Sequence, residues 1–127
     1  PADFRLKYPD TIKHYLEVQK KLHLDFNELL STSGVETVGE EFFDELFAEA
    51  VSLAEKRNVP LYCGEYGVIN LADNDSRTAW YRAINSSMKK YGISGAIWCY
   101  KEMDFGLMDY NARLNSSIES FMSEISV

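Results

Sequence analysis

The sequence contains two short apolar segments with a helical segment between them, and this arrangement limits the folds open to the chain. The two segments cover residues 59–63 and 93–100, and a helix is expected between them from about residue 76 to residue 91. A strand, a helix and a strand in this order form a parallel βαβ unit. Two parallel strands alone leave the faces and outer edges of their sheet uncovered. We therefore expect a βαβ unit that belongs to a larger α/β structure.

The first predicted strand ends on a carboxylate, Glu65, between two glycines at positions 64 and 67. A strand end holds its side chain on a rigid support, and glycines let backbone and substrate approach closely. The second strand ends on an aromatic residue, Trp98, at the corresponding end of a parallel pair. We interpret Glu65 as a catalytic carboxylate. The alternative, from these residues alone, is a glutamate at an ordinary strand-to-loop turn.

The composition narrows the classes of partner. The 127 residues are 46% hydrophobic, 13% aromatic and 26% charged, as in globular proteins, and they carry a net charge of -7. This charge argues against nucleic acid and against an anionic membrane as partners, because both are negatively charged. No apolar run approaches the roughly 20 residues of a membrane-spanning helix, and no signal-peptide pattern occurs. A neutral or cationic ligand is easier to accommodate.

Two cysteines, Cys63 and Cys99, lie in the predicted strands. Side chains alternate across a strand, so we expect Cys63 on the same face as Glu65 and Cys99 on the face opposite Trp98. The two sulfurs then point in different directions. We expect two reduced, buried thiols and no disulfide between them.

The two histidines, His14 and His23, are far from both cysteines in sequence. No pair of cysteines or histidines has the spacing of a metal-binding motif. We therefore predict no metal site and no cofactor, with each histidine on a surface or helix face.

The remaining pattern predicts helices over residues 11–24, 38–57, 76–91 and 116–125, with residues 25–36 irregular. Thr37 and Glu40 have the spacing of a capping box for the second of these helices. Asp75 or Asn74 is expected to cap the third, and Gly92 to end it.

Three motifs carry a resemblance to a known family: PLYCGEYG at 60–67, GAIWCYK at 95–101 and DFGLMD at 104–109. Together they resemble the C-terminal part of the (β/α)8 TIM barrel of glycoside hydrolase family 5, the cellulase-like family. The resemblance covers residues from about 39 to 125, whereas residues 1–38 match poorly. It implies an α/β fold in which the two strands are the seventh and eighth of the barrel. Residues 1–127 would then be a C-terminal fragment of one barrel domain.

The resemblance also implies roles for individual residues. In this family the seventh strand ends in the glutamate nucleophile, which corresponds to Glu65, and the eighth ends in a tryptophan that stacks on the sugar, which corresponds to Trp98. Lys101 and Glu102 follow the second strand and are candidates to hydrogen-bond sugar hydroxyls, or are ordinary loop charges. Tyr66 is a further candidate, packing beside Glu65 or donating to it. The implied activity is retaining hydrolysis of a β-1,4-linked polysaccharide, as in an endoglucanase.

Two elements of the family pattern are absent. The family's acid/base glutamate follows an asparagine at the end of the fourth strand, and a His-x-Tyr element comes from the sixth. Here the one Asn-Glu pair, Asn27-Glu28, lies in the irregular segment. We therefore expect about the last third of a barrel, catalytically incomplete by itself. Its expected partners are a β-linked glycan and the N-terminal remainder of the barrel or a complementary chain.

Two alternatives remain open at this point. One is a non-catalytic carbohydrate-binding half-barrel module, in which Trp98 binds sugar and Glu65 only hydrogen-bonds it. The other is a fragment of an unrelated α/β domain without sugar chemistry.

Overall fold

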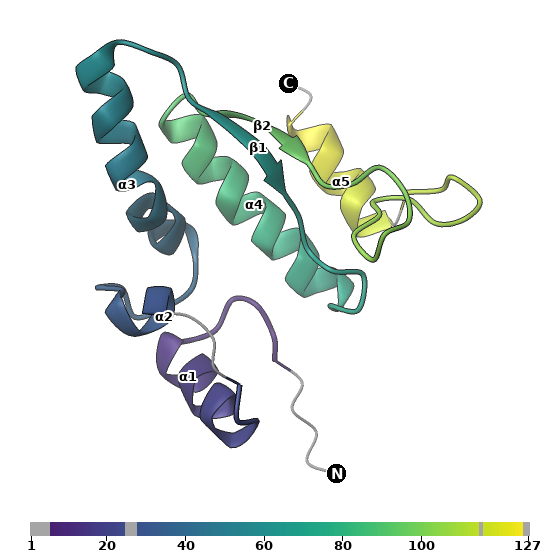
Figure 1. Cartoon of the computed structure of the whole chain (residues 1–127). Coiled ribbons are helices and arrows are strands. Elements are labelled where there is room, and N and C mark those ends of the chain that lie inside the picture. The colour runs from purple at the N-terminus through teal and green to yellow at the C-terminus, as the bar shows by residue number, and fades with distance from the viewer. Residues whose placement is uncertain (1–5, 25–27, 115, 126–127) are drawn as a thin grey trace.

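The computed structural model describes residues 6–24, 28–114 and 116–125. The helices and strands of these residues follow in the order α1 (Ile12–Lys21), α2 (Glu28–Thr32), α3 (Glu40–Arg57), β1 (Tyr62–Tyr66), α4 (Asn74–Lys90), β2 (Ser94–Ile97) and α5 (Ser116–Ile125). β1 and β2 pair in parallel, and α4 connects them (Figure 1). The predicted βαβ unit is therefore present. Helices α3 and α5 pack on the two sides of α4, and α1 and α2 lie together at the start of α3.

The first strand begins three residues later than predicted, at Tyr62. The chain is still leaving α3 at residue 59: Asn58 is a left-handed C-cap with φ 51°, and the Val59 N–H donates to the Ala54 carbonyl at 3.1 Å. The backbone of Val59 therefore completes the C-terminal end of α3 and does not belong to the strand. The second strand stops at Ile97, short of the predicted residue 100.

The two strands do not stay in simple register. The Cα partners are Tyr62 with Ser94, Cys63 with Gly95, and Tyr66 with Ile97. Three steps along β1 therefore match two steps along β2. The extra residue is a β-bulge, and it sets Gly64 and Glu65 together opposite Ala96.

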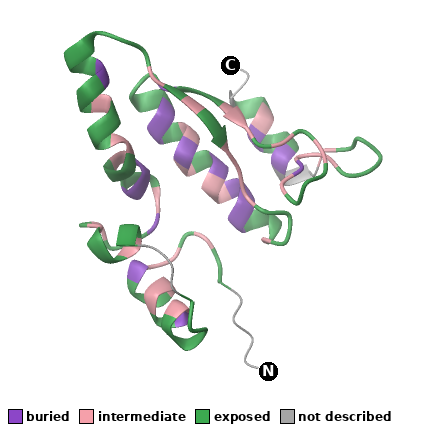
Figure 2. Ribbon diagram, viewed as in Figure 1, coloured by how far each residue is buried: buried purple, intermediate pink, exposed green. Residues whose placement is uncertain are grey.

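The core lies on the helix side of the sheet. Cys63 and Tyr66 both pack against a cluster formed by Phe43, Ile84, Met88 and Ile93. Ile97 packs against a second cluster, which α4 and α5 share, formed by Tyr81, Ile118 and Phe121. Figure 2 shows the buried positions gathered on the helices and no buried residue on the strands. The described strands are thus covered on one face only.

Helix α3 begins differently from the prediction. Its N-cap is Gly39, which makes no side-chain capping bond, so the predicted capping box of Thr37 and Glu40 is wrong. Thr37 instead forms an antiparallel bridge with Thr11, next to the start of α1. The segment expected to be irregular also contains α2, while residues 25–27 of that segment lie outside the described residues.

The N-cap of helix α4 precedes both predicted caps. Asp73 is the N-cap, and its carboxylate accepts hydrogen bonds from the Ser76 N–H at 2.9 Å and from the Ser76 hydroxyl at 2.7 Å. The predicted caps, Asp75 and Asn74, lie inside the helix. The helix ends as predicted, with Gly92 in the left-handed region at φ 64°.

A charged network joins α3 to α4. Asp44 on α3 accepts from the Ser87 hydroxyl at 2.6 Å and from the Lys90 ammonium at 2.7 Å. Desolvation raises the pKa of the Asp44 carboxyl, but the hydrogen bonds from Lys90 and Ser87 outweigh it and hold this pKa below its usual value of 3.8. The network therefore stabilises the folded chain when Asp44 is ionised.

Candidate active site

The ends of β1 and β2 touch through their backbones. The Trp98 N–H donates to the Tyr66 carbonyl at 2.8 Å. A Cβ atom added at Gly67 would lie 2.1 Å from the Trp98 carbonyl oxygen, so position 67 has no room for a side chain. This close approach is the physical reason for the second glycine of the Gly-Glu-Tyr-Gly motif. It fixes the strand end that carries Glu65 against the strand end that carries Trp98.

Glu65 and Trp98 share the face of the sheet that the helices leave uncovered. Because Cys63 and Tyr66 pack toward α4, we infer that the two bulge residues between them point the other way. Trp98 follows the helix-facing Ile97 and therefore also points away from the helices. We call this the open face, and it consists of Tyr62, Gly64, Glu65, Ser94, Ala96 and Trp98. Tyr62 is 67% exposed, Trp98 is 39% exposed and Glu65 is exposed.

The bulge also corrects the prediction for the cysteines. Strict alternation places Cys63 beside Glu65, whereas the extra residue leaves Cys63 on the helix side. Both thiols are free, as predicted, but they are half-buried rather than buried. The Cys99 thiol donates to the Glu102 carbonyl at 3.2 Å, in the loop that follows β2. The peptide bond between Trp98 and Cys99 is cis.

The structure gives Tyr66 a different partner from the predicted one. Its hydroxyl donates to the Asn85 side-chain oxygen on α4 at 3.0 Å, and not to Glu65. Its ring stacks on Trp80, with 6.5 Å between ring centroids. Burial raises the pKa of the Tyr66 phenol. Tyr66 therefore anchors the end of β1 to α4 from the side opposite the open face.

Lys101 and Glu102 lie in a hollow of about 280 Å³ beyond the ends of the strands. The other residues that line it are Asn70, Met103, Asp104, Met108, Asp109 and Tyr110. The loop after β1 closes on the loop after β2 here, because the Asn70 N–H donates to the Asp104 carbonyl at 2.6 Å. Ammonium, carboxylate, amide and phenol groups are suitable partners for sugar hydroxyls. Sequence reasoning missed Asn70 and Tyr110, since neither belongs to a motif and only the folded loops bring them here.

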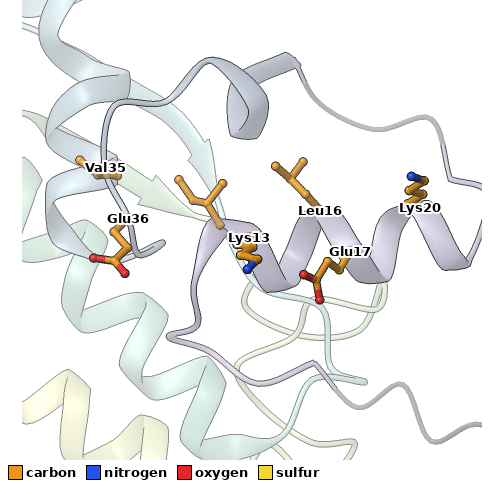
Figure 3. Close-up of a pocket in the computed structure, with 7 residues that line it drawn as sticks. Lys13, Leu16, Glu17, Lys20, Val35 and Glu36 are labelled. Atoms are coloured by element: carbon orange, nitrogen blue, oxygen red, sulfur yellow. The ribbon is translucent and has the colours of Figure 1, made fainter.

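A second hollow lies apart from the candidate active site. Its volume is about 470 Å³, and it is lined by Ile12, Lys13, Leu16, Glu17, Lys20, Val35 and Glu36. Figure 3 shows that Lys13, Leu16, Glu17 and Lys20 come from α1, whereas Val35 and Glu36 come from the segment that precedes α3. Neither Glu65 nor Trp98 borders it.

In residues 6–24, 28–114 and 116–125, no three His, Cys, Asp or Glu side chains gather where they could hold a metal ion. None of the helices over these ranges is long and apolar enough to cross a membrane.

Comparison with known proteins finds cellulases and a cellodextrinase that are similar to part of the chain. No family model matches it. The chain is 48% identical to Endoglucanase C of Acetivibrio thermocellus over 56 residues, which are 44% of this chain. It is 47% identical to Cellodextrinase A of Ruminococcus flavefaciens over 55 residues, which are 43% of this chain. A hyperthermophilic endo-β-1,4-glucanase crystallised with substrate superposes on 65% of the chain with a TM-score of 0.58 and 28% identity. The chain is similar to the cellulase-like enzymes of glycoside hydrolase family 5.

The predicted resemblance is thus confirmed, and the chain has the α/β character that it implies. The match accounts for a small part of each relative. The aligned segment is 16% of Endoglucanase C and 16% of Cellodextrinase A, and 26% of the glucanase of known structure.

Proposed function

We propose that this chain supplies the seventh and eighth strands and the nucleophile of a retaining endo-β-1,4-glucanase. The observation that carries the proposal is the position of Glu65 and Trp98 on the open face, at the ends of two neighbouring parallel strands. In a barrel of alternating strands and helices, the side chains at these strand ends form the active site. The names of the relatives, endoglucanase and cellodextrinase, support a β-linked glucan as substrate.

In the proposed reaction the Glu65 carboxylate attacks the anomeric carbon of the sugar, and the bond to the leaving oxygen breaks as an acid on another strand protonates it. Water then attacks the glycosyl ester at the same carbon, and Glu65 is released with the anomeric configuration retained. Such enzymes hold their two carboxyl groups about 5–5.5 Å apart. The Trp98 indole offers an apolar plane for the C–H face of a pyranose ring. Lys101 and Glu102 bind the hydroxyls of a neighbouring sugar.

The exposed residues of the open face support the proposal that another part of the barrel covers this side of the sheet. Parallel strands are stable when both faces of the sheet are buried, yet Tyr62, Glu65 and Trp98 lie exposed on this face of the described structure. We propose that the N-terminal remainder of the barrel, or a complementary chain, covers it and supplies the acid/base glutamate. The 127 residues by themselves would then bind sugar weakly and not turn it over.

Covalent labelling tests the proposal. The full protein that contains this chain would be treated with a 2-deoxy-2-fluoro cellobioside, digested and sequenced by mass spectrometry. We expect the label on Glu65, none in the Glu65→Gln variant, and normal labelling of Glu65 in the matched Glu49→Gln variant, because Glu49 is exposed on α3 and lies outside the proposed site. Turnover by Glu65→Gln, or a label on another residue, would contradict the nucleophile role. Sugar binding without any label would support the non-catalytic binding module instead.

A further inference from the structure

Arg77 is the charged side chain that the described part of the chain buries, with 5% of its surface exposed. Its Nη2 donates to the Gly106 carbonyl at 3.1 Å, and its Nε has no hydrogen-bond partner among the described residues. Burying a cation costs free energy unless its bonds compensate. The surface arginine of the same helix, Arg82, contrasts with it because Arg82 forms an exposed ion pair with Glu124 at 2.7 Å. The burial of Arg77 against a loop carbonyl therefore suggests that this side chain has a specific role.

The carbonyl that Arg77 binds belongs to a tightly packed point of the loop after β2. A Cβ atom at Gly106 would lie 2.8 Å from the Glu102 nitrogen and 3.2 Å from the Lys101 carbonyl carbon. Gly106 is buried and lies directly against the backbone that carries these two side chains. Any displacement of Gly106 therefore moves the Lys101–Glu102 backbone as well.

The other end of this connection is rigid. Arg77 lies in the first turns of α4, which the Asp73 cap fixes through Ser76. The Arg77 N–H also donates to the Asp73 carbonyl at 2.9 Å. Helix α4 in turn follows the loop that leaves the Glu65 strand. The guanidinium thus ties the loop after β2 to the helix that follows β1.

We propose that Arg77 is a positioning residue that sets the sugar contacts of Lys101 and Glu102 relative to Glu65. The proposal rests on the proposed function and adds a residue that does not touch the sugar. Arginine suits the task because its planar fork reaches a carbonyl with fixed geometry, whereas lysine is a flexible point charge. Loss of the bond would leave the active-site carboxylate in place and loosen the loop.

Limited proteolysis tests the structural part without any activity measurement. Trypsin cleaves after Lys101, and the rate of this cut in the full protein reports local opening of the loop. We expect Arg77→Met to speed it by about tenfold, the effect of losing one charged hydrogen bond. Cleavage after Arg57 in α3 is the internal control for global unfolding. The matched Arg82→Met variant should cut at the wild-type rate, and equal rates at Lys101 in all three proteins would overturn the proposal.

Kinetics test the functional part. We expect Arg77→Met to raise KM for a long cello-oligosaccharide by about tenfold while kcat on a short aryl glycoside stays near the wild-type value. Arg77→Lys should restore part of the KM. Gly106→Ala, which leaves Arg77 intact but displaces Glu102, should likewise raise KM for the long substrate and leave kcat on the short substrate unchanged. A uniform loss of kcat on both substrates, or no change in KM, would overturn the positioning role.

The two proposals fail in different ways. Unimpaired turnover by Glu65→Gln would refute the nucleophile assignment. The cleavage rate after Lys101 would still decide whether Arg77 holds the loop.

Discussion

Gly67 offers a sharp test of how the two strand ends are held. In Gly67→Ala the new methyl group would lie 2.1 Å from the Trp98 carbonyl oxygen and 3.2 Å from its carbonyl carbon. Real Cβ contacts essentially never fall below 3.0 Å, so the two strand ends must separate by about 0.9 Å. The atoms that must move are backbone atoms, and no rotamer change relieves the clash.

The size of the effect follows from this displacement. Overpacking of this kind costs about 1–3 kcal/mol of stability, and stretching the hydrogen bond from Trp98 to Tyr66 adds about 1 kcal/mol. A shift of about 1 Å between catalytic groups can lower the rate by about 100-fold. We therefore expect Gly67→Ala to lose about 2–4 kcal/mol in unfolding free energy and about 100-fold in kcat/KM.

The assay compares two glycine variants of the full protein. Urea unfolding followed by circular dichroism gives the stability, and hydrolysis of a cello-oligosaccharide gives kcat/KM. Gly34→Ala is the matched control, because its nearest atom to a new Cβ is the Glu45 carboxylate oxygen at 3.9 Å, an ordinary contact. Wild-type stability and activity in Gly67→Ala would refute the close approach of the two strand ends.

Three further predictions concern stability. Asp44→Asn should destabilise the protein at pH 6 but not near pH 2. The lowered pKa of Asp44 contributes stability above pH 3.8, and this stability is lost as the pH falls through the pKa of the folded state. Urea unfolding at both pH values checks this, and an equal loss of unfolding free energy at both would contradict it. Asp73→Ala should lower the unfolding free energy in the same assay because it removes the N-cap of α4, whereas Asp75→Ala, which removes no cap, should lower it clearly less. Tyr66→Phe should lower the unfolding free energy by about 1 kcal/mol through the lost bond to Asn85 with unchanged kcat, and a large fall in kcat would revive a direct role.

The order of elements could be predicted because it depends on local patterns. Alternation of apolar residues, turn glycines and helix periodicity define a βαβ unit without any knowledge of contacts. The motif around Glu65 and the tryptophan at the end of the second strand also revealed the resemblance to cellulase-like enzymes, which the comparisons confirm.

What the sequence did not predict depends on contacts across strands. The bulge that separates Cys63 from Glu65 is a property of the pairing with β2, and a period of two along one strand cannot reveal it. The orientation of Tyr66 follows from the same bulge and from Asn85 on α4.

Helix starts and loops show a similar limit. Asp73, Asn74 and Asp75 all have capping side chains, and only the folded backbone selects the first. The hollow that holds Lys101 and Glu102 is built by a hydrogen bond between Asn70 and Asp104, which are far apart in the sequence.

The most direct test of the central claim is a crystal structure of the full protein inactivated with the fluorinated cellobioside. We predict electron density that joins the Glu65 carboxylate to the anomeric carbon, with the sugar ring lying on the Trp98 indole. A Glu65 side chain directed toward α4, or a sugar bound away from Trp98, would contradict it.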